Sequence, residues 1–185
     1  SIIQDGRVRT VSLCISPEKT EARYDKIHLF DVQVSDAVGG YQESRFFEPG
    51  DEVVVAKTPF GNIGLMVCYD LRFPELALIL RQQGANILTA PAAFTYTTGQ
   101  LHWQLLLQAR AMDSQCYVLG AAQQGWHGEQ RQTWGHAGIT NSRGQLLEMI
   151  TVEGHGLITS SFDLAEQNDI RLAMPLMQHR KLINY

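Results

Sequence analysis

The sequence predicts an α/β fold in which parallel strands alternate with helices. A near-continuous apolar run at residues 63–67 is typical of a strand buried on both faces. A helix is predicted next, from Phe73-Pro74-Glu75 to Gly84, and residues 86–90 then form a second buried strand. This order of strand, sharp turn, helix and strand implies a parallel pair joined by a right-handed crossover.

Short strands and turns are predicted before this unit. Asp5-Gly6 separates Ile2-Ile3 from an alternating segment at residues 8–13, which is the strongest short hairpin signal a sequence gives. The chain is therefore expected to begin inside a sheet. The next elements expected are a turn at 17–19, an apolar segment at 23–30, a glycine-rich loop at 39–50, a strand at 53–55 and a turn at 59–62.

A second helix and a series of hairpins are predicted after the unit. The expected order is a helix at 101–112, a strand at 116–122, strands at 135–140 and 146–150 around a turn at 141–144, a turn at Glu153-Gly154, a strand at 156–162 and a helix at 164–172. The two main helices each show an apolar face, formed by Leu76, Ile79 and Leu80 in the first and by Leu101, Leu105, Ala109 and Met112 in the second.

The composition describes one globular domain, residues 1–185. The chain is 44% hydrophobic and 18% charged, with 15 Lys and Arg against 19 Asp and Glu. The net charge of -4 and the absence of a basic cluster argue against binding to nucleic acid or to an anionic membrane surface. The charged fraction lies below the roughly 25% typical of soluble domains. Either a partner subunit covers part of the surface or the composition has simply drifted.

Cysteine usage indicates reduced thiols and a cytoplasmic location. The number of cysteines is odd, and no two of them have C-x-x-C spacing: they are Cys14, Cys68 and Cys116. The first residues lack the basic segment followed by an apolar segment that is typical of a targeting signal. Residues 82–109 contain no Asp, Glu, Lys or Arg, but polar residues interrupt them throughout. This stretch is not a membrane span, and it suits a buried wall around a ligand.

Two residues stand out as candidates for chemistry. Cys68 follows a buried strand, so its thiol is expected above the carboxyl end of a parallel sheet, where open α/β sheets bind ligands. A helix N-terminus and Arg72 are expected to lower its pKa, although most such cysteines simply pack in the core. Lys26 lies among apolar residues and would need an anionic partner, or it is a surface lysine on an edge strand. Glu43 is the nearest carboxylate expected on the same rim.

Other site types have little support. No histidine has the spacing to another ligand-type residue that a metal site requires, so no metal is expected. A papain-like Cys-His-Asn peptidase singles out no particular histidine, and Gly61 and Gly64 do not form a phosphate loop. No organic cofactor is expected either.

From about Gly6 to the end, the chain resembles the nitrilase, or carbon–nitrogen hydrolase, superfamily. The blocks that carry the resemblance are R-Y-D-K-I-H-L-F-D at 23–31, Y-Q-E-S at 41–44, G-L-M-V-C-Y-D-L-R-F-P-E at 64–75, A-F-T-Y-T-T-G-Q-L-H-W at 93–103 and Q-A-R-A-M-D-S-Q-C-Y at 108–117. Residues 121–131 and 174–180 are most similar to the Nit branch, and within it to the deaminated glutathione amidases rather than the ω-amidases.

The resemblance implies catalytic roles for four residues. Cys68 would attack an amide or nitrile carbon and form a thioester that water then hydrolyses. Lys26 and the backbone N–H of Tyr69 would stabilise the oxyanion, and Glu43 matches the family's second glutamate beside the lysine.

The resemblance also implies a substrate. Arg72, Phe94 and Thr98 match positions at which relatives hold a carboxylate, a role that arginine suits through bidentate pairing. The expected reaction is hydrolysis of a non-peptide C–N bond in a small carboxylate-bearing amide. Deaminated glutathione is the first choice, and an ω-amide of a 2-oxo acid is the alternative.

The family fold is a four-layer α-β-β-α sandwich whose copies pair, which implies a homodimer or higher homo-oligomer. Its general-base glutamate lies in an N-terminal β-α-β-α portion that this chain is expected to lack, and losing a general base costs about 10²- to 10⁴-fold in rate. The chain alone is therefore expected to be inactive and poorly soluble. Three explanations stay open: part of a longer enzyme, a truncated non-catalytic binding or structural subunit, or a shortened fold in which Glu43 is the base.

Overall fold

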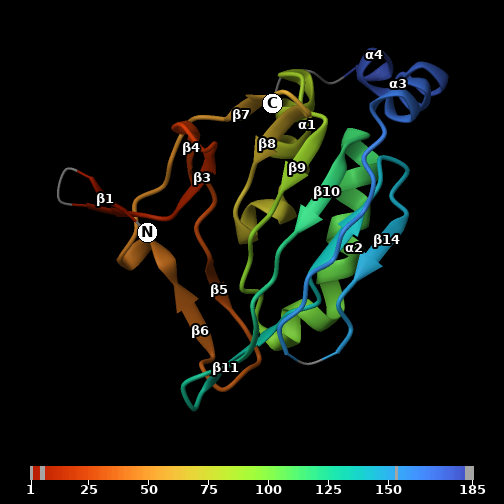
Figure 1. The fold of residues 1–185 in the computed structure, drawn as a ribbon. Helices are drawn as coiled ribbons and strands as arrows, with labels where there is room; N and C mark the ends of the chain where they lie inside the picture. Colours follow the sequence, from red (N-terminus) through yellow and green to blue (C-terminus); the bar gives the residue numbers. More distant parts are fainter. Residues whose placement is uncertain (1, 5–6, 153, 182–185) are drawn as a thin grey trace.

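The centre of the structure is a six-stranded mixed sheet (Figure 1). The structure is a computed structural model that describes residues 2–4, 7–152 and 154–181. In spatial order the strands are β14 (Leu146–Met149), β13 (Gly138–Thr140), β10 (Tyr117–Gly120), β9 (Ile87–Thr89), β8 (Gly61–Leu65) and β7 (Val55–Thr58). The three central strands β8, β9 and β10 are parallel, and the outer strands are antiparallel to their neighbours. The predicted parallel pair is confirmed.

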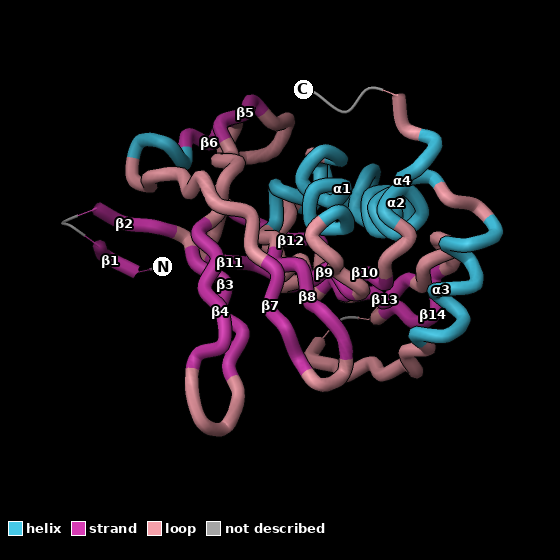
Figure 2. Tube along the Cα trace, turned by 90° about the horizontal axis from the view of Figure 1, so that it is seen from above, coloured by secondary structure: helices cyan, strands magenta, loops and turns pink. Residues whose placement is uncertain are grey.

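Two helices cover one face of this sheet (Figure 2). Helix α1 (Pro74–Gln82) begins with Pro74 in its first turn, and α2 (Tyr96–Ser114) begins after Thr95, whose hydroxyl accepts the Thr98 N–H. Gln115 ends α2 in the left-handed conformation. Two further helices, α3 (Leu164–Ala173) and α4 (Leu176–His179), follow near the end of the chain.

Four hairpins and two 3₁₀ turns surround the sheet. The hairpins pair β1 (Ile2–Gln4) with β2 (Arg7–Arg9), β3 (Val11–Ile15) with β4 (Thr20–Asp25), β5 (Asp31–Gln33) with β6 (Gly40–Gln42), and β11 (Gln124–His127) with β12 (Arg131–Trp134). The 3₁₀ turns are η1 (Glu43–Arg45) and η2 (Cys68–Arg72). The predicted turn Asp5-Gly6 lies outside the described residues, but the strands flanking it pair, with Gln4 opposite Arg7.

The core lies between the sheet and the two covering helices. Its fully or nearly buried members include Leu76, Leu80, Leu88, Trp103, Leu107, Ala111 and Val118. Each large apolar side chain buried in this way stabilises the fold by about 1.5–3 kcal/mol. The core fixes α1 and α2 against β8, β9 and β10, and therefore fixes the strand ends at which the site is built.

The predicted apolar face of the second helix is wrong as a core face. Leu101, Leu105 and Met112 are 66%, 64% and 55% exposed, whereas Trp103 and Leu107 face the sheet. In α1, Leu76 and Leu80 are buried as predicted but Ile79 is 40% exposed. Helix α2 carries apolar residues on two faces, and periodicity alone does not say which of them meets the sheet.

Several strand predictions also need correction. The strand expected at 53–55 begins only at Val55, and residues 156–162 form no strand. The hairpins β5–β6 and β11–β12 lie in segments where none was predicted. Their strands are three or four residues long, too short to show a clear alternation. The predicted turn at Glu153-Gly154 includes Glu153, which lies outside the described residues.

Of the four layers that the resemblance implies, the described residues form this sheet and the helix layer upon it. Val118 and Gly120 of β10 face α2, because a side chain added at Gly120 would meet Leu107 and Trp103. Leu119 between them faces the opposite side and is 36% exposed. Figure 2 shows the segment that follows β14 crossing on that side, away from α1 and α2.

Replacing Gly99 in α2 by alanine tests the packing of this helix on β12. Alanine has the higher helix propensity, but its Cβ would lie 2.2 Å from the Trp134 Cβ. We expect Gly99→Ala to lower the free energy of unfolding by about 1–3 kcal/mol, the usual effect of overpacking. Urea denaturation measures it, with the exposed Gln100→Ala as the matched control. Equal stability of the two variants would contradict the close contact.

Candidate active site

Cys68 is held in a strained turn after the central strand β8. It is the first residue of η2, and its φ of 51° is a left-handed conformation that non-glycine residues rarely adopt. Its own N–H donates to the Pro91 carbonyl at 2.9 Å. Among the described residues, the Tyr69 N–H meets no hydrogen-bond acceptor. The turn thus presents a thiol beside an unused backbone donor.

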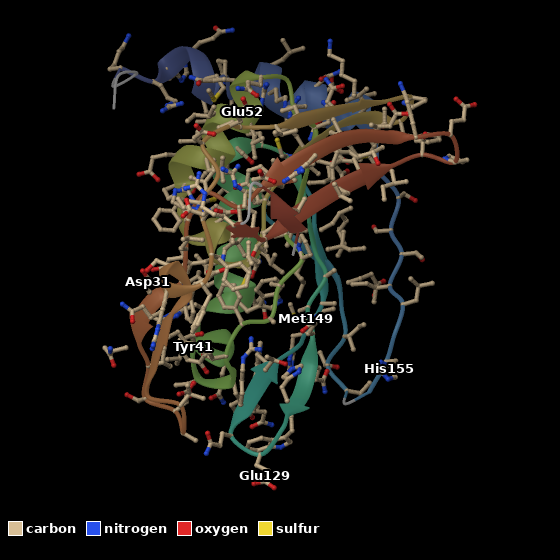
Figure 3. The ribbon with its side chains drawn as sticks, turned by 90° about the vertical axis from the view of Figure 1, so that its left-hand side faces the viewer. Asp31, Tyr41, Glu52, Glu129, Met149 and His155 are labelled. Carbon is tan, nitrogen blue, oxygen red and sulfur yellow. The ribbon has the colours of Figure 1, made fainter. Side chains whose placement is uncertain are left out.

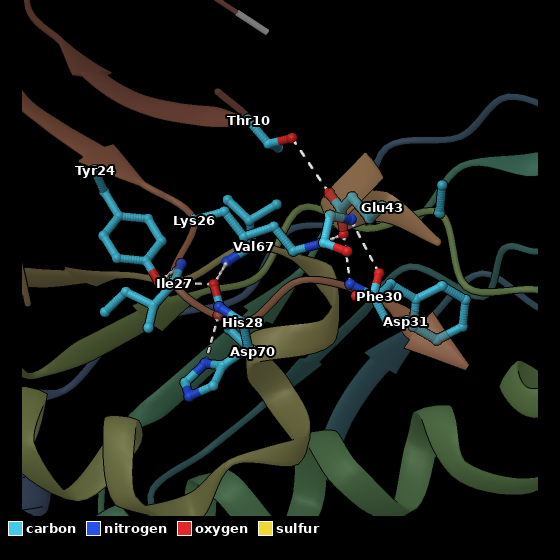
Figure 4. A network of polar contacts seen from close by, with 12 residues as sticks. Thr10, Tyr24, Lys26, Ile27, His28, Phe30, Asp31, Glu43, Val67 and Asp70 are labelled. Carbon is cyan, nitrogen blue, oxygen red and sulfur yellow. Dashed lines mark hydrogen bonds and ion pairs between the residues drawn. The ribbon is translucent and has the colours of Figure 1, made fainter. Parts of the chain in front are cut away.

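The buried carboxylate of Asp70 ties this turn to the segment that carries Lys26 (Figure 4). Its Oδ2 accepts the Val67 N–H and the Tyr24 hydroxyl, both at 2.8 Å. Its Oδ1 accepts the His28 N–H at 3.0 Å and lies 2.8 Å from the His28 Nδ1. The His28 ring also stacks on Phe73 at 3.7 Å. Four polar groups from two distant segments therefore converge on one buried anion.

Lys26 and Glu43 form an ion pair at the edge of the same turn. The Lys26 side chain is only 4% exposed, and its Nζ lies 2.5 Å from the Glu43 Oε2. Glu43 also accepts the Phe30 N–H at 2.7 Å and the Thr10 hydroxyl at 3.4 Å. Sequence analysis left open whether Lys26 has an anionic partner or is a surface lysine; the side chain is buried, and Glu43 is its partner. Both carboxylate oxygens of Glu43 are occupied, which fixes the position of the lysine.

These residues open onto a cavity of about 910 Å³. Cys68, Lys26, Glu43 and Tyr69 all line it, together with residues from β6, the segment 91–95 and β12. The uncharged stretch 82–109 was expected to form a wall around a ligand, and residues 91–95 and Thr98 do line the cavity. The structure therefore brings the predicted nucleophile, lysine and glutamate to one concave site.

The three predicted substrate-binding residues are placed differently. Phe94 and Thr98 line the cavity, whereas Arg72 is not among the described residues that do. The Arg72 guanidinium lies over the rings of Phe94, at 5.2 Å, and Tyr69, at 6.0 Å. Both of its terminal nitrogens lie 3.3 Å from the His102 Nδ1. Arg72 thus packs against two residues of the cavity wall without lining the cavity itself.

The prediction that the Cys68 pKa is lowered is wrong. Burial raises the pKa of the thiol above its ordinary value, because desolvation disfavours the thiolate. A backbone hydrogen bond from Ala93 and the positive charge of Lys26 oppose this effect, whereas Glu43 and Asp70 reinforce it. The expected helix N-terminus is not at the thiol either, because Cys68 begins the 3₁₀ turn and α1 starts only at Pro74.

Sequence reasoning missed several residues of the site. Asp70 lies two residues after Cys68, but an acidic residue next to a cysteine carries no pattern of its own. Arg131 lines the cavity from β12, in a hairpin that was not predicted. No motif marks Arg131 in the sequence, and the sequence alone does not show that this residue reaches the cavity.

Two searches of the described residues gave negative results. No three His, Cys, Asp or Glu side chains there converge to form a possible metal site. No helix in that part of the chain has the length and hydropathy needed to cross a membrane.

Comparison with known proteins gives a consistent picture. A family model described as carbon–nitrogen hydrolase matches residues 4–171. The chain is 43% identical over 178 residues to the deaminated glutathione amidase of Yersinia enterocolitica, covering 96% of the chain and 62% of that protein. It is 45% identical over 161 residues to the deaminated glutathione amidase of Mus musculus, covering 86% of the chain and 49% of the relative.

Solved structures support the same fold. The crystal structure of the C. elegans NitFhit protein matches with a TM-score of 0.84 and 37% identity, covering 95% of this chain and 42% of that one. The similarity therefore extends over nearly the whole chain, while the chain spans about half to two thirds of the length of the two curated relatives named.

The raised Cys68 pKa has a measurable consequence. We expect the rate of Cys68 alkylation by iodoacetamide to keep rising above about pH 8.5, the pKa of an ordinary thiol. Lys26→Met removes a charge that lowers the pKa and shifts the profile to higher pH, whereas Glu43→Gln shifts it to lower pH. Peptide mass mapping follows Cys68, with Cys14 as the internal reference. A rate that levels off below pH 7 would contradict the burial argument.

Proposed function

The chain belongs to the carbon–nitrogen hydrolase family, and from this premise we propose that it hydrolyses the amide bond of a small carboxylate-bearing substrate. The observation that carries the proposal is that Cys68, Lys26 and Glu43 line one cavity. The names of the Yersinia and mouse relatives make deaminated glutathione the best candidate substrate.

In the proposed reaction Cys68 is the nucleophile. Its sulfur attacks the amide carbon, the carbonyl oxygen becomes an oxyanion, and the thiol proton is transferred to the nitrogen of the leaving amine. The Lys26 ammonium and the unused Tyr69 N–H are the donors proposed to stabilise that charge. Collapse of the intermediate breaks the C–N bond, the amine leaves with a proton, and water then hydrolyses the thioester to a carboxylic acid and the free thiol.

Glu43 is assigned the role of holding Lys26 rather than that of the general base. Its oxygens already accept hydrogen bonds from Lys26, the Phe30 N–H and the Thr10 hydroxyl. Both of its carboxylate oxygens are therefore engaged by groups other than the Cys68 thiol. Burying an ammonium group as deeply as Lys26 needs a charge partner, and Glu43 supplies it.

Phe94 and Thr98 are proposed as part of the substrate-binding wall. Phe94 is buried and packs on Trp103 at 5.0 Å between ring centroids, so its position is fixed by the core. The Thr98 hydroxyl lies 2.8 Å from that of Thr95, the N-cap of α2. The three free cysteines suit a reducing compartment, and we place the protein in the cytoplasm on that basis.

Turnover of deaminated glutathione tests the proposed reaction. Hydrolysis of its amide bond would release 2-oxoglutarate, which a coupled assay measures. We expect Cys68→Ala to lower the rate by at least about 10³-fold and Lys26→Met by about 10²- to 10³-fold, because they remove the nucleophile and an oxyanion donor. Both variants should keep the circular dichroism spectrum of the wild type.

The intact mass of the protein is measured on the same preparation. A mass of 20.7 kDa together with no amide hydrolysis would favour a non-catalytic subunit. Hydrolysis of 2-oxo acid ω-amides in place of deaminated glutathione would favour the alternative substrate. Full activity in Cys68→Ala would refute the mechanism.

We also propose that the exposed apolar stripe of α2 pairs with a second copy of the chain. Leu101, Leu105 and Met112 lie on one side of this helix, and all three are more than half exposed. A monomer rarely leaves three such side chains in a row in water, whereas a homodimer interface buries them.

A charge introduced in the stripe tests this pairing. We expect Leu105→Arg to convert a dimer to a monomer in size-exclusion chromatography with light scattering, because an arginine would be buried without a partner. Gln104→Arg, at the adjacent exposed position outside the stripe, is the matched control and should leave the mass unchanged. A wild-type protein that is monomeric at high concentration would contradict the proposal.

A further inference from the structure

The charged side chains of the cavity are not balanced. Three charged residues line it, namely Lys26, Glu43 and Arg131. Lys26 and Glu43 neutralise each other as an ion pair. No carboxylate of the described residues forms an ion pair with Arg131. The cavity therefore keeps one positive charge that the protein does not compensate.

Hydrogen bonding leaves the same guanidinium incomplete. One terminal nitrogen of Arg131 donates to the Ala93 carbonyl at 3.2 Å, which anchors the group next to the cavity wall. The Nε is buried and has no partner among the described residues. A buried donor without an acceptor destabilises the protein. An anionic ligand in the cavity would supply the missing negative charge.

The surroundings of Arg131 hold it beside the cavity. It begins β12, and its position opposite His127 is fixed by the β11–β12 ladder. Tyr41 of β6 lines the same cavity, and burial and Asp36 raise the pKa of its phenol to about 12, against the lowering effect of Arg131. Figure 3 shows the β5–β6 hairpin, with Tyr41, and the β11–β12 hairpin, with Glu129 at its turn, extending to the same end of the molecule.

Arg72, the arginine favoured by sequence, is less suited to this role. Its guanidinium stacks over Phe94 and Tyr69 and lies against His102, and it does not line the cavity. Both aromatic residues that it contacts line the cavity, whereas Arg72 does not. Arg131 reaches that space directly.

We propose that Arg131 binds a carboxylate of the substrate while Cys68 attacks the amide carbon. This inference rests on the proposed amide hydrolysis and adds the residue that selects for an acidic substrate. A guanidinium pairs with a carboxylate through two parallel N–H donors, so neutral amides of the same length should lack this contribution.

Protection of Cys68 from iodoacetamide tests the inference without requiring turnover. The probes are two pairs of equal length, glutaramate with glutaramide and adipamate with adipamide, in which only one member carries a carboxylate. In the wild type we expect the carboxylate member to protect Cys68 at a lower concentration. In Arg131→Gln we expect its protection constant to weaken about 10- to 100-fold, with the neutral member unchanged.

Three matched variants separate the explanations. Arg131→Lys should recover part of the loss, since it keeps the charge but not the fork. Lys57→Gln removes an exposed charge outside the cavity and should leave the protection constants unchanged. A loss of protection in Arg72→Gln that is absent in Arg131→Gln would overturn the inference in favour of Arg72.

The remaining outcomes are also decisive. Equal protection by both members of each pair in the wild type, or no protection by any of the four compounds, would refute carboxylate binding by Arg131. Protection that depends on Arg131 in a protein that hydrolyses no amide would refute the proposed reaction and leave the binding role intact. Thermal unfolding of each variant confirms that it is folded.

Discussion

The site depends on the buried carboxylate of Asp70. It holds Val67 on one side and Tyr24 and His28 on the other, so the turn that carries Cys68 and the segment that carries Lys26 keep a fixed relation. A charge buried this completely is tolerated only when every oxygen is hydrogen-bonded, as it is here. The Val67 N–H that Asp70 accepts belongs to the residue immediately before Cys68, whose backbone is left-handed.

Electrostatics in the cavity follow from this burial. The enclosed thiol of Cys68 favours its neutral form, and the positive charge of Lys26 offsets part of that preference. Glu43 in turn offsets the cost of burying the Lys26 ammonium group and fixes the orientation of that side chain. Arg131 is the exception, a cation beside an otherwise mostly apolar wall with no carboxylate partner among the described residues. The charges of Lys26 and Glu43 beside the nucleophile thus balance each other, whereas the charge of Arg131 at the cavity wall is not balanced by a described carboxylate.

Sequence patterns predicted the order of the strands and helices more accurately than they predicted which residues of each element are buried. The run at 63–67 and the proline-initiated helix after it were identifiable because a strand buried on both faces and a Pro at a helix start each have a local signature. The side of α2 that faces the sheet was not identifiable from the sequence, because the exposed Leu101 and Leu105 are as apolar as the buried Leu107. The β11–β12 hairpin was not predicted because its strands are four residues long, and strands that short show little periodicity.

The sequence by itself determined the parallel strand pair and the position of Cys68 after it, and it limited Lys26 to two possibilities, a buried cation with an anionic partner or a surface lysine. These follow from local patterns and from the cost of burying a charge. Only the tertiary structure decided that Glu43 is that partner, that Asp70 joins the two halves of the site, and that Arg131 rather than Arg72 reaches the cavity. Such contacts join residues 17 to more than 40 positions apart, and their pairing is set by how the strands and hairpins pack rather than by any local signal.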